Sequence, residues 1–219
     1  MPALSELLNT ITLGDSLEVL KTLPDQCVDL ILTDPPYGKK ADKGTNGFGC
    51  AKNNRYVAEW DSERPSAEFF GEILRVSKKS IIFGGNYFAD LLPPSTCWLV
   101  WDKVGEFHFS SPFSDVELAW TNFSRAAKKY TVIQHGFIKD DRAERIHPTQ
   151  KPEALFLAIL QEFASPGQII LDPFSGSGTT AIACHRLGLD FVAIERDPGY
   201  HAASLARLNA ERAQLLLDI

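Results

Sequence analysis

Two short stretches of the chain combine reactive residue types with residues that hold a backbone turn rigid. The first is Asp34-Pro35-Pro36-Tyr37, which follows the apolar run 28–33. Two successive prolines fix φ and remove two N–H donors, so this turn presents carboxylate and carbonyl acceptors. Open α/β sheets place their chemistry at the carboxyl ends of parallel strands, where this turn is expected to lie.

These acceptors suit an amino group whose nitrogen is a poor nucleophile. The exocyclic nitrogen of adenine has its lone pair delocalised into the ring. Asp34 and the Pro35 carbonyl could accept its two hydrogens and draw that lone pair out of conjugation. The ring of Tyr37 offers an extruded base a stacking face worth roughly 1–3 kcal/mol. The alternative is a tight proline turn with no catalytic role.

The second stretch is the glycine loop PFSGSGTT, which follows the apolar run 168–172 and leads into a helical pattern. Gly176 and Gly178 would let a ligand approach the backbone closely. The spacing is neither GxGxxG nor that of a phosphate-gripping loop, so a nucleoside without a phosphate chain fits best. Glu195 ends the next apolar run, where a carboxylate could accept hydrogen bonds from both hydroxyls of a ribose. The alternative is a simple turn, with Glu195 capping the following helix.

Short apolar runs alternate with helical patterns, which indicates an α/β fold with a parallel sheet covered on both faces. The predicted strands are 28–33, 80–85, 97–102, 168–172 and 190–195, and the predicted helices are 65–78, 151–164, 179–188 and 198–217. The stretches 114–123 and 130–134 read as two more strands around a basic turn, and we expect them to form a hairpin.

Composition limits the class of protein. A chain of 219 residues with 44% hydrophobic residues suits one buried core, so we expect a single domain over 1–219. The four cysteines lack the paired spacing of a zinc site and the density of a disulfide scaffold, so we expect no metal and a reduced, cytoplasmic location. No stretch has the character of a signal peptide or a membrane span, and we expect no membrane partner.

A net charge of −6 argues mildly against a nucleic-acid partner, but the basic residues are clustered. The segment 39–55 has five basic residues and one acidic residue, and 125–151 has seven and three, so each carries +4. The alternative is ordinary solvated surface. The residues expected to contact DNA are Lys39, Lys40, Lys43, Lys52, Arg55, Arg125, Lys128, Lys129, Arg142 and Arg145.

Over nearly its whole length, the chain resembles the amino-group DNA methyltransferases, whose catalytic motif DPPY and cofactor motif match 34–37 and DPFSGSGTT. The catalytic motif comes first, as in the permuted β-type arrangement, and HPTQKPEAL at 147–155 is similar to that group's lead-in. The resemblance implies a Rossmann-like S-adenosylmethionine (SAM)-dependent methyltransferase fold, mostly parallel, with a C-terminal-type hairpin and circularly permuted motifs.

The resemblance also implies roles for individual residues. Asp34, Pro35, Pro36 and Tyr37 would be catalytic. Asp15 would lie near the adenine of SAM, or else cap the helix that follows it; Thr149 and Lys151 would lie near the methionine carboxylate. The residues expected to bind the cofactor are Asp15, Thr149, Lys151, Asp172, Phe174, Gly176, Ser177, Gly178, Thr179 and Glu195.

The implied activity is site-specific methylation of adenine N6 in double-stranded DNA, by direct in-line attack of a flipped base on SAM. Aspartate at the first motif position favours adenine over cytosine N4, which is the alternative. A non-catalytic DNA-binding protein of the same fold is a weaker one. Methylation at cytosine C5 is excluded, because no cysteine stands in a Pro-Cys context.

Two segments are expected to serve DNA recognition. We predict a mobile loop near the active site at 38–60 and a small target-recognition region at 109–146. Because this region is short, we expect a short target, help from a second subunit in a homodimer, or loose specificity. With no nuclease signature in the sequence, a restriction-modification or solitary phage-type methylase of a bacterial cell is expected.

Overall fold

A central eight-stranded sheet organises the computed structural model, which describes residues 4–38, 64–107, 114–135, 138–139, 146 and 150–215. The strand order is β1-β10-β9-β2-β3-β5-β4-β6. The strands are β1 (Thr10–Leu13), β2 (Val28–Thr33), β3 (Ser77–Phe83), β4 (Trp98–Asp102), β5 (Val116–Thr121), β6 (Lys128–Thr131), β9 (Ile169–Asp172) and β10 (Asp190–Glu195). Within this sheet, only β5 runs antiparallel to its neighbours. Beside the sheet, β7 (Gln134–His135) and β8 (Ile138–Lys139) pair antiparallel.

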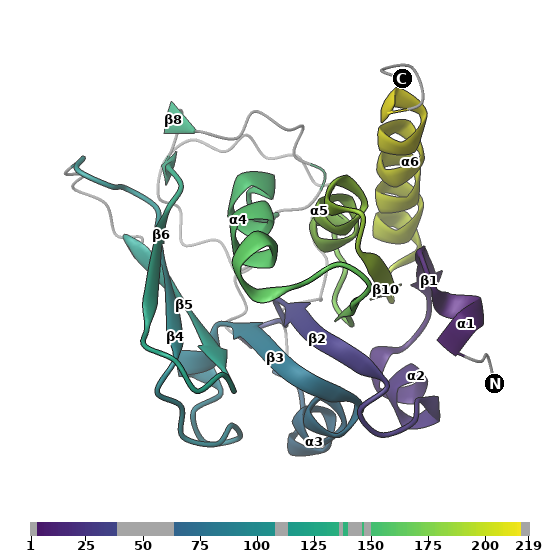
Figure 1. Ribbon diagram of the computed structural model, residues 1–219, viewed down its shortest axis with the longest axis horizontal. Coiled ribbons are helices and arrows are strands. Elements are labelled where there is room, and N and C mark those ends of the chain that lie inside the picture. The colour runs from purple at the N-terminus through teal and green to yellow at the C-terminus, as the bar shows by residue number, and fades with distance from the viewer. Residues whose placement is uncertain are drawn as a thin grey trace.

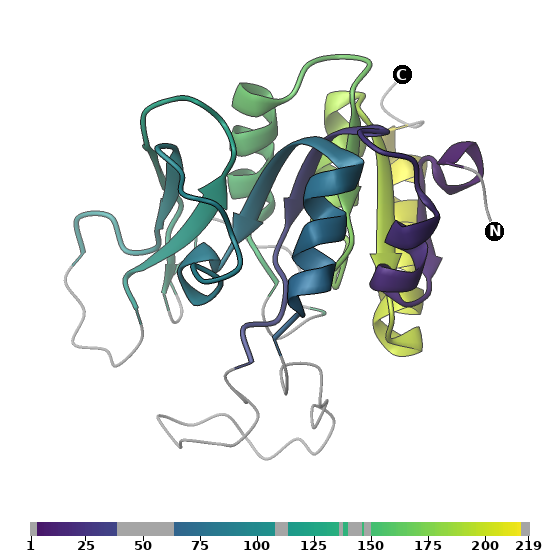
Figure 2. The same cartoon turned by 90° about the horizontal axis from the view of Figure 1, so that it is seen from below.

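Helices cover both faces of the sheet, as the alternating pattern predicted (Figure 1). They are α1 (Leu4–Leu7), α2 (Ser16–Thr22), α3 (Ala67–Val76), the short 3-10 helix η2 (Gly85–Tyr87), α4 (Glu153–Phe163), α5 (Thr179–Leu187) and α6 (Pro198–Leu215). Figure 2 shows α3 in front of the sheet and α4 and α6 behind it. Each face has its own buried cluster, one with α2 and α3 and one with α4 and α5.

Local sequence signals set several of these boundaries. Ser66 caps α3 by accepting a hydrogen bond from the Phe69 N–H at 3.2 Å. Gly188 ends α5 at φ +63°, a left-handed conformation that glycine adopts without steric cost. The predicted strands 28–33 and 190–195 match β2 and β10 at both ends.

The expected hairpin of 114–123 with 130–134 is wrong. β5 and β6 lie on opposite sides of β4, β5 antiparallel to it and β6 parallel. The apolar strand β4 buries Leu99 and Trp101 and so takes the internal position. β6, with the exposed Lys128 and Lys129, lies at the edge, where charged residues prevent further strand pairing. The other edge is β1, which the sequence patterns did not predict.

The sheet has a switch point between β9 and β2. These two strands are parallel neighbours, but β9 connects through α5 to β10 on one side and β2 connects through α3 to β3 on the other. Diverging connections leave a crevice at the carboxyl ends of the two strands, which is where open α/β sheets bind ligands.

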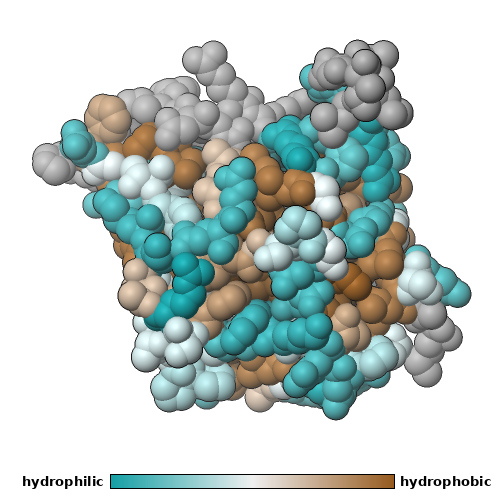
Figure 3. Space-filling model, in the orientation of Figure 1, coloured by the Kyte–Doolittle hydropathy of each residue, from teal (hydrophilic) through white to brown (hydrophobic). Residues whose placement is uncertain are grey.

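In the part of the chain that the structure describes, no helix has the length and apolar character to cross a membrane. On the face shown in Figure 3, apolar patches are interrupted by polar residues.

Gly84, directly after β3, allows a close approach that no other residue type would. Its φ is +69°, and a Cβ there would lie 2.1 Å from Cε1 of Tyr37. The Tyr37 ring therefore lies on the Gly84 backbone, which fixes the turn that follows β2.

Gly84→Ala is expected to lower the free energy of unfolding by about 1–3 kcal/mol, because it adds both backbone strain and a clash. The control is Gly71, inside α3, where an added Cβ would meet nothing within 4 Å. Gly71→Ala should raise the free energy of unfolding by about 0.5–1 kcal/mol. Urea unfolding of both variants measures this, and a harmless Gly84→Ala would contradict the close approach.

Candidate active site

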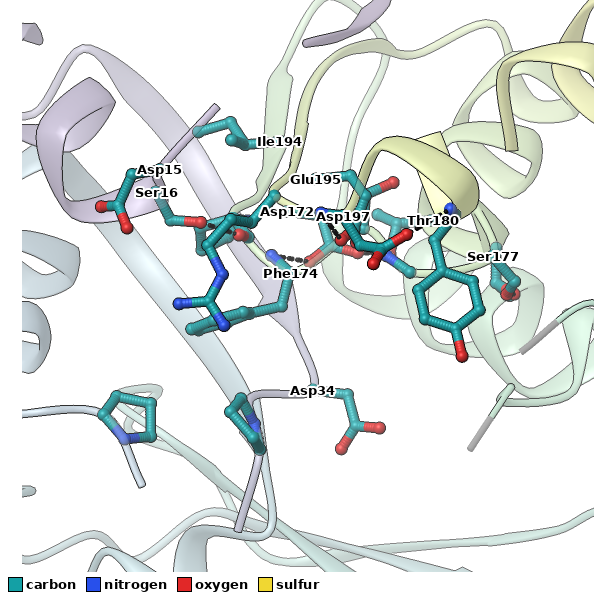
Figure 4. Close-up of a pocket in the computed structure, with 18 of the residues that line it drawn as sticks. Asp15, Ser16, Asp34, Asp172, Phe174, Ser177, Thr180, Ile194, Glu195 and Asp197 are labelled. Atoms are coloured by element: carbon teal, nitrogen blue, oxygen red, sulfur yellow. Dashed lines mark hydrogen bonds between the residues drawn. The ribbon is translucent and has the colours of Figure 1, made fainter. Parts of the chain in front are cut away.

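The two motifs that the sequence singled out open into the same pocket, although more than a hundred residues separate them. This pocket has a volume of about 720 Å³ and lies at the carboxyl ends of β2, β9 and β10. Asp34 and Pro36 line it from one motif, and Phe174, Gly176 and Ser177 from the other. In Figure 4, Asp34 lies across the open space from Phe174 and Ser177 of the glycine loop.

Both oxygens of the Asp34 carboxylate are engaged. The Tyr37 hydroxyl donates a hydrogen bond to Oδ1 at 2.5 Å, and the Lys151 ammonium contacts Oδ2. The Tyr37 ring also stacks on Tyr87, with 4.9 Å between ring centroids. Pro35 and Tyr37 are not among the residues that line the pocket, so stacking of a base on Tyr37 stays a prediction. The Tyr37 hydroxyl helps to orient the carboxylate.

Lys151 lines the same pocket, where its ammonium pairs with Asp34 and, at 3.2 Å, with Glu117. Its place near the methionine carboxylate of SAM stays a prediction. Burial raises the pKa of Asp34 above its ordinary value; Lys151 opposes this rise and Glu117 adds to it. Burial acts to lower the pKa of Lys151, but the two carboxylates outweigh it and raise that pKa. Lys151 therefore stays charged.

Glu195 is held by the backbone of two loops. Its carboxylate accepts hydrogen bonds from the N–H groups of Gly176 and Asp197, both at 2.8 Å. The alternative role as a helix cap falls instead to Asp197, which accepts from the N–H groups of Gly199 and Tyr200 at the start of α6. Glu195 lines the pocket in a fixed position, as a ribose ligand would require.

Asp172 joins the ends of neighbouring elements while lining the pocket. Its carboxylate accepts hydrogen bonds from the hydroxyls of Thr33 (2.8 Å) and Thr180 (2.5 Å) and from the Phe174 N–H (3.1 Å). Burial raises its pKa to about 6, although these three donors act to lower it. This residue ties β2, β9 and α5 together at the switch point.

Asp15 has the capping role that was one of the two predicted for it. It caps α2 by accepting hydrogen bonds from the N–H groups of Leu17 (2.9 Å) and Glu18 (3.2 Å). It also lines the pocket, and its place near the adenine of SAM stays a prediction. Ser16, next to it, donates to the Pro173 carbonyl and so ties α2 to the glycine loop.

Two of the remaining predicted cofactor residues are buried side chains that line the pocket. Ser177 and Thr179 line the pocket and are buried, with 3.0 Å between their hydroxyl oxygens. Gly178 precedes α5 at φ +78°, and a Cβ there would meet Ser204 at 3.2 Å. Thr149 lies outside the described residues.

Sequence reasoning missed the wall of the pocket formed around the start of α3. Arg64, Ser66 and Phe69 all line it, and the Phe69 ring lies 4.9 Å from that of Phe174. The sequence analysis included Phe69 only as part of the predicted helix 65–78. The available signal was that α3 is the next described helix after β2, because the helix after a parallel strand begins near that strand's carboxyl end.

The pocket fits a nucleoside that carries a polar tail. Ligand pockets are typically about 300–1,000 Å³, and this one combines aromatic walls with the fixed carboxylate of Glu195. Ser175 Oγ is buried at the pocket without a hydrogen-bond partner in the described part of the chain, so it could bond to a ligand.

The basic turn between β5 and β6 is not placed for DNA binding at the pocket. Arg125 and Lys128 pair with Glu162 at 2.8 and 3.1 Å, and Lys129 pairs with Asp102 at 3.1 Å. Glu162 is in the last turn of α4, roughly 13 Å along the helix from its pocket end. Acidic partners offset the charge of these three residues, and their contact with DNA stays a prediction.

The other basic residues, Lys39, Lys40, Lys43, Lys52, Arg55, Arg142 and Arg145, lie outside the described residues. So do most of the proposed loop 38–60 and parts of the recognition region 109–146, and their roles stay predictions.

Comparison with known proteins identifies the family. A family model described as "DNA methylase", N6_N4_Mtase, matches residues 89–206, which is more than half of the chain. The chain therefore belongs to the amino-group DNA methyltransferases, as the resemblance predicted. It is 26% identical to the Type II methyltransferase M.HinfI of Haemophilus influenzae, covering 94% of this chain and 69% of that protein. It is 28% identical to M.HpaI of Haemophilus parainfluenzae, covering 90% and 73%.

Solved structures confirm the fold. The M1.HpyAVI–SAM complex matches with a TM-score of 0.57 at 26% identity, covering 91% of this chain and 98% of that one. The PvuII DNA methyltransferase, described as cytosine-N4-specific, matches with a TM-score of 0.59 at 15% identity, covering 94% and 92%. The expected fold class and class of enzyme, a SAM-dependent DNA methyltransferase, are confirmed.

Glu195→Gln should weaken the binding of SAM and of S-adenosylhomocysteine equally, by about tenfold each, because a ribose contact is common to both ligands. Isothermal titration with each ligand measures this. Unchanged affinities would remove Glu195 from the ribose site.

Lys128→Ala combined with Lys129→Ala should leave the salt dependence of DNA binding unchanged, since both side chains have acidic partners. Lys39→Ala with Lys40→Ala is the comparison and should reduce the slope of log K against log salt by about 1–2. A reduced slope for the first pair would return the β5–β6 turn to the DNA interface.

Proposed function

We propose that this protein methylates the exocyclic N6 of adenine in DNA by direct transfer from SAM to a flipped base. The observation that carries the proposal is that Asp34 and the glycine loop line the same pocket. A base held at the first and a cofactor held at the second would meet without any rearrangement of the sheet.

When bound, SAM supplies a sulfonium methyl group, which is electrophilic enough to need neither a metal ion nor a covalent enzyme intermediate. The residues of the chain then have to position the base. Asp34 and the Pro35 carbonyl accept the two hydrogens of the amino group, which frees the nitrogen lone pair. Orientation of this kind contributes on the order of 7–11 kcal/mol.

The contacts already made by Asp34 leave room for this role. A carboxylate has about four acceptor positions, and Tyr37 and Lys151 each use one. Both contacts hold the carboxylate at a fixed angle in the pocket. The Lys151 pair also favours the ionised state, which is the state that accepts hydrogen bonds from an amino group.

Adenine is favoured over cytosine by the identity of the first motif residue. In the family pattern, aspartate at this position is commoner among adenine enzymes, and serine is typical of many cytosine N4 enzymes. Asp34 supports N6 on this ground, with cytosine N4 as the alternative that the experiment must separate. The segment 39–55, which follows the motif directly and carries +4, is proposed to contact DNA.

Asp34→Ala is expected to abolish methyl transfer while lowering SAM affinity by no more than about tenfold, because the carboxylate acts directly on the base and contributes to SAM binding through its charge alone. Transfer is measured by digesting incubated DNA to nucleosides and quantifying N6-methyladenine and N4-methylcytosine by mass spectrometry. Wild-type protein should yield N6-methyladenine only.

Glu195→Gln serves as the matched control, since its main loss should be in SAM affinity. If the product is N4-methylcytosine, the substrate base is cytosine and the proposal of adenine is wrong. Equal loss of SAM binding and transfer in Asp34→Ala would contradict the division of roles.

A further inference from the structure

Four side chains of alternating charge form a row that begins at the pocket. Asp34 contacts Lys151, Lys151 lies 3.2 Å from Oε2 of Glu117, and Lys103 lies 3.3 Å from Oε1 of Glu117. They come from four separate parts of the chain: the end of β2, the residues before α4, β5, and the residue after β4. Asp34 and Lys151 line the pocket, while Glu117 and Lys103 stand behind them.

Burying the Lys151 ammonium group costs free energy of desolvation unless nearby anions neutralise its charge. Its side chain is only 7% exposed, and ammonium groups removed from water need close anionic partners. Asp34 alone would neutralise it, but the Asp34 charge would then be cancelled at the pocket. Glu117 provides the second carboxylate. Burial acts to raise the pKa of Glu117, but Lys151 and Lys103 outweigh this effect and hold it below its usual range, so Glu117 is charged.

We propose that Glu117 is a positioning residue that, by sharing Lys151, preserves the negative charge of Asp34 at the pocket and so makes the site select the cationic cofactor. The inference rests on the proposed function, because it requires SAM in this pocket. Asp34 with Lys151 sums to zero, and the addition of Glu117 gives −1. Lys103 contacts the other oxygen of Glu117 and brings the sum of the four charges to zero, but it is not among the residues that line the pocket.

The charge matters because the ligand loses its own charge in the reaction. SAM carries a sulfonium cation, and after transfer the C–S bonding pair remains on sulfur as a neutral thioether. The positive charge passes to the base nitrogen, which then loses a proton to solvent. A pocket with a net negative charge binds SAM more tightly than S-adenosylhomocysteine and favours the cation that forms on the nitrogen.

The test compares dissociation constants for SAM and S-adenosylhomocysteine by isothermal titration, without DNA. In Glu117→Gln the preference for SAM should fall roughly five- to tenfold, through weaker SAM binding alone. Glu117→Asp, which keeps the charge, should restore most of the preference. Lys103→Met should shift it the opposite way, because it leaves Glu117 less neutralised.

Glu162→Gln is the matched control, since it removes the same charge at the far end of α4 and should leave the preference unchanged. An unchanged ratio in both Glu117→Gln and Lys103→Met would overturn the inference. If Glu117→Gln does not fold, Lys103→Met tests the inference by itself. A stronger preference for SAM in Lys103→Met supports the inference, and an unchanged or weaker preference overturns it. Wild-type protein that binds neither ligand would instead contradict the proposed function.

Discussion

The site depends on β2 and β9 being parallel neighbours whose connections diverge. Their contact brings Asp34 and the glycine loop, which are distant in sequence, to one crevice. The hydrogen bond from Thr33 to Asp172 crosses between the two strand ends, and Thr180 fixes the same carboxylate from α5. A flipped base and a cofactor can then be held facing each other by elements that are rigid before either ligand binds.

Charge is the second constraint on the site. The proposed function requires the pocket to accept a cationic cofactor and a base from an anionic polymer, and the buried Lys151 is one of the residues that line it. The structure resolves this conflict by giving Lys151 two carboxylate partners. Negative charge is concentrated inside the crevice, whereas the basic segment 39–55 follows directly after the catalytic turn in the chain. We propose that DNA and SAM are attracted by different parts of the molecule.

Signals that act locally predicted much of the fold. Apolar runs located β2 and β10 to the residue, Ser66 and Gly188 marked helix ends, and the DPPY and glycine motifs located the pocket. The predictions failed where contacts between residues distant in sequence determine the strand order and the ion-pair partners. β4 lies between β5 and β6, although periodicity suggested a hairpin. The partners of Lys151 and Lys128 come from distant elements, so neither the ion pair with Asp34 nor the neutralised basic turn could be read from spacing.

The most direct test of the central claim is a crystal structure of the protein with SAM bound. The account predicts the ribose at Glu195 and the sulfonium methyl directed toward Asp34, with a gap that one amino nitrogen could bridge at about 3–3.5 Å from the methyl carbon. A cofactor whose methyl group points away from Asp34, or which binds on another edge of the sheet, would contradict it.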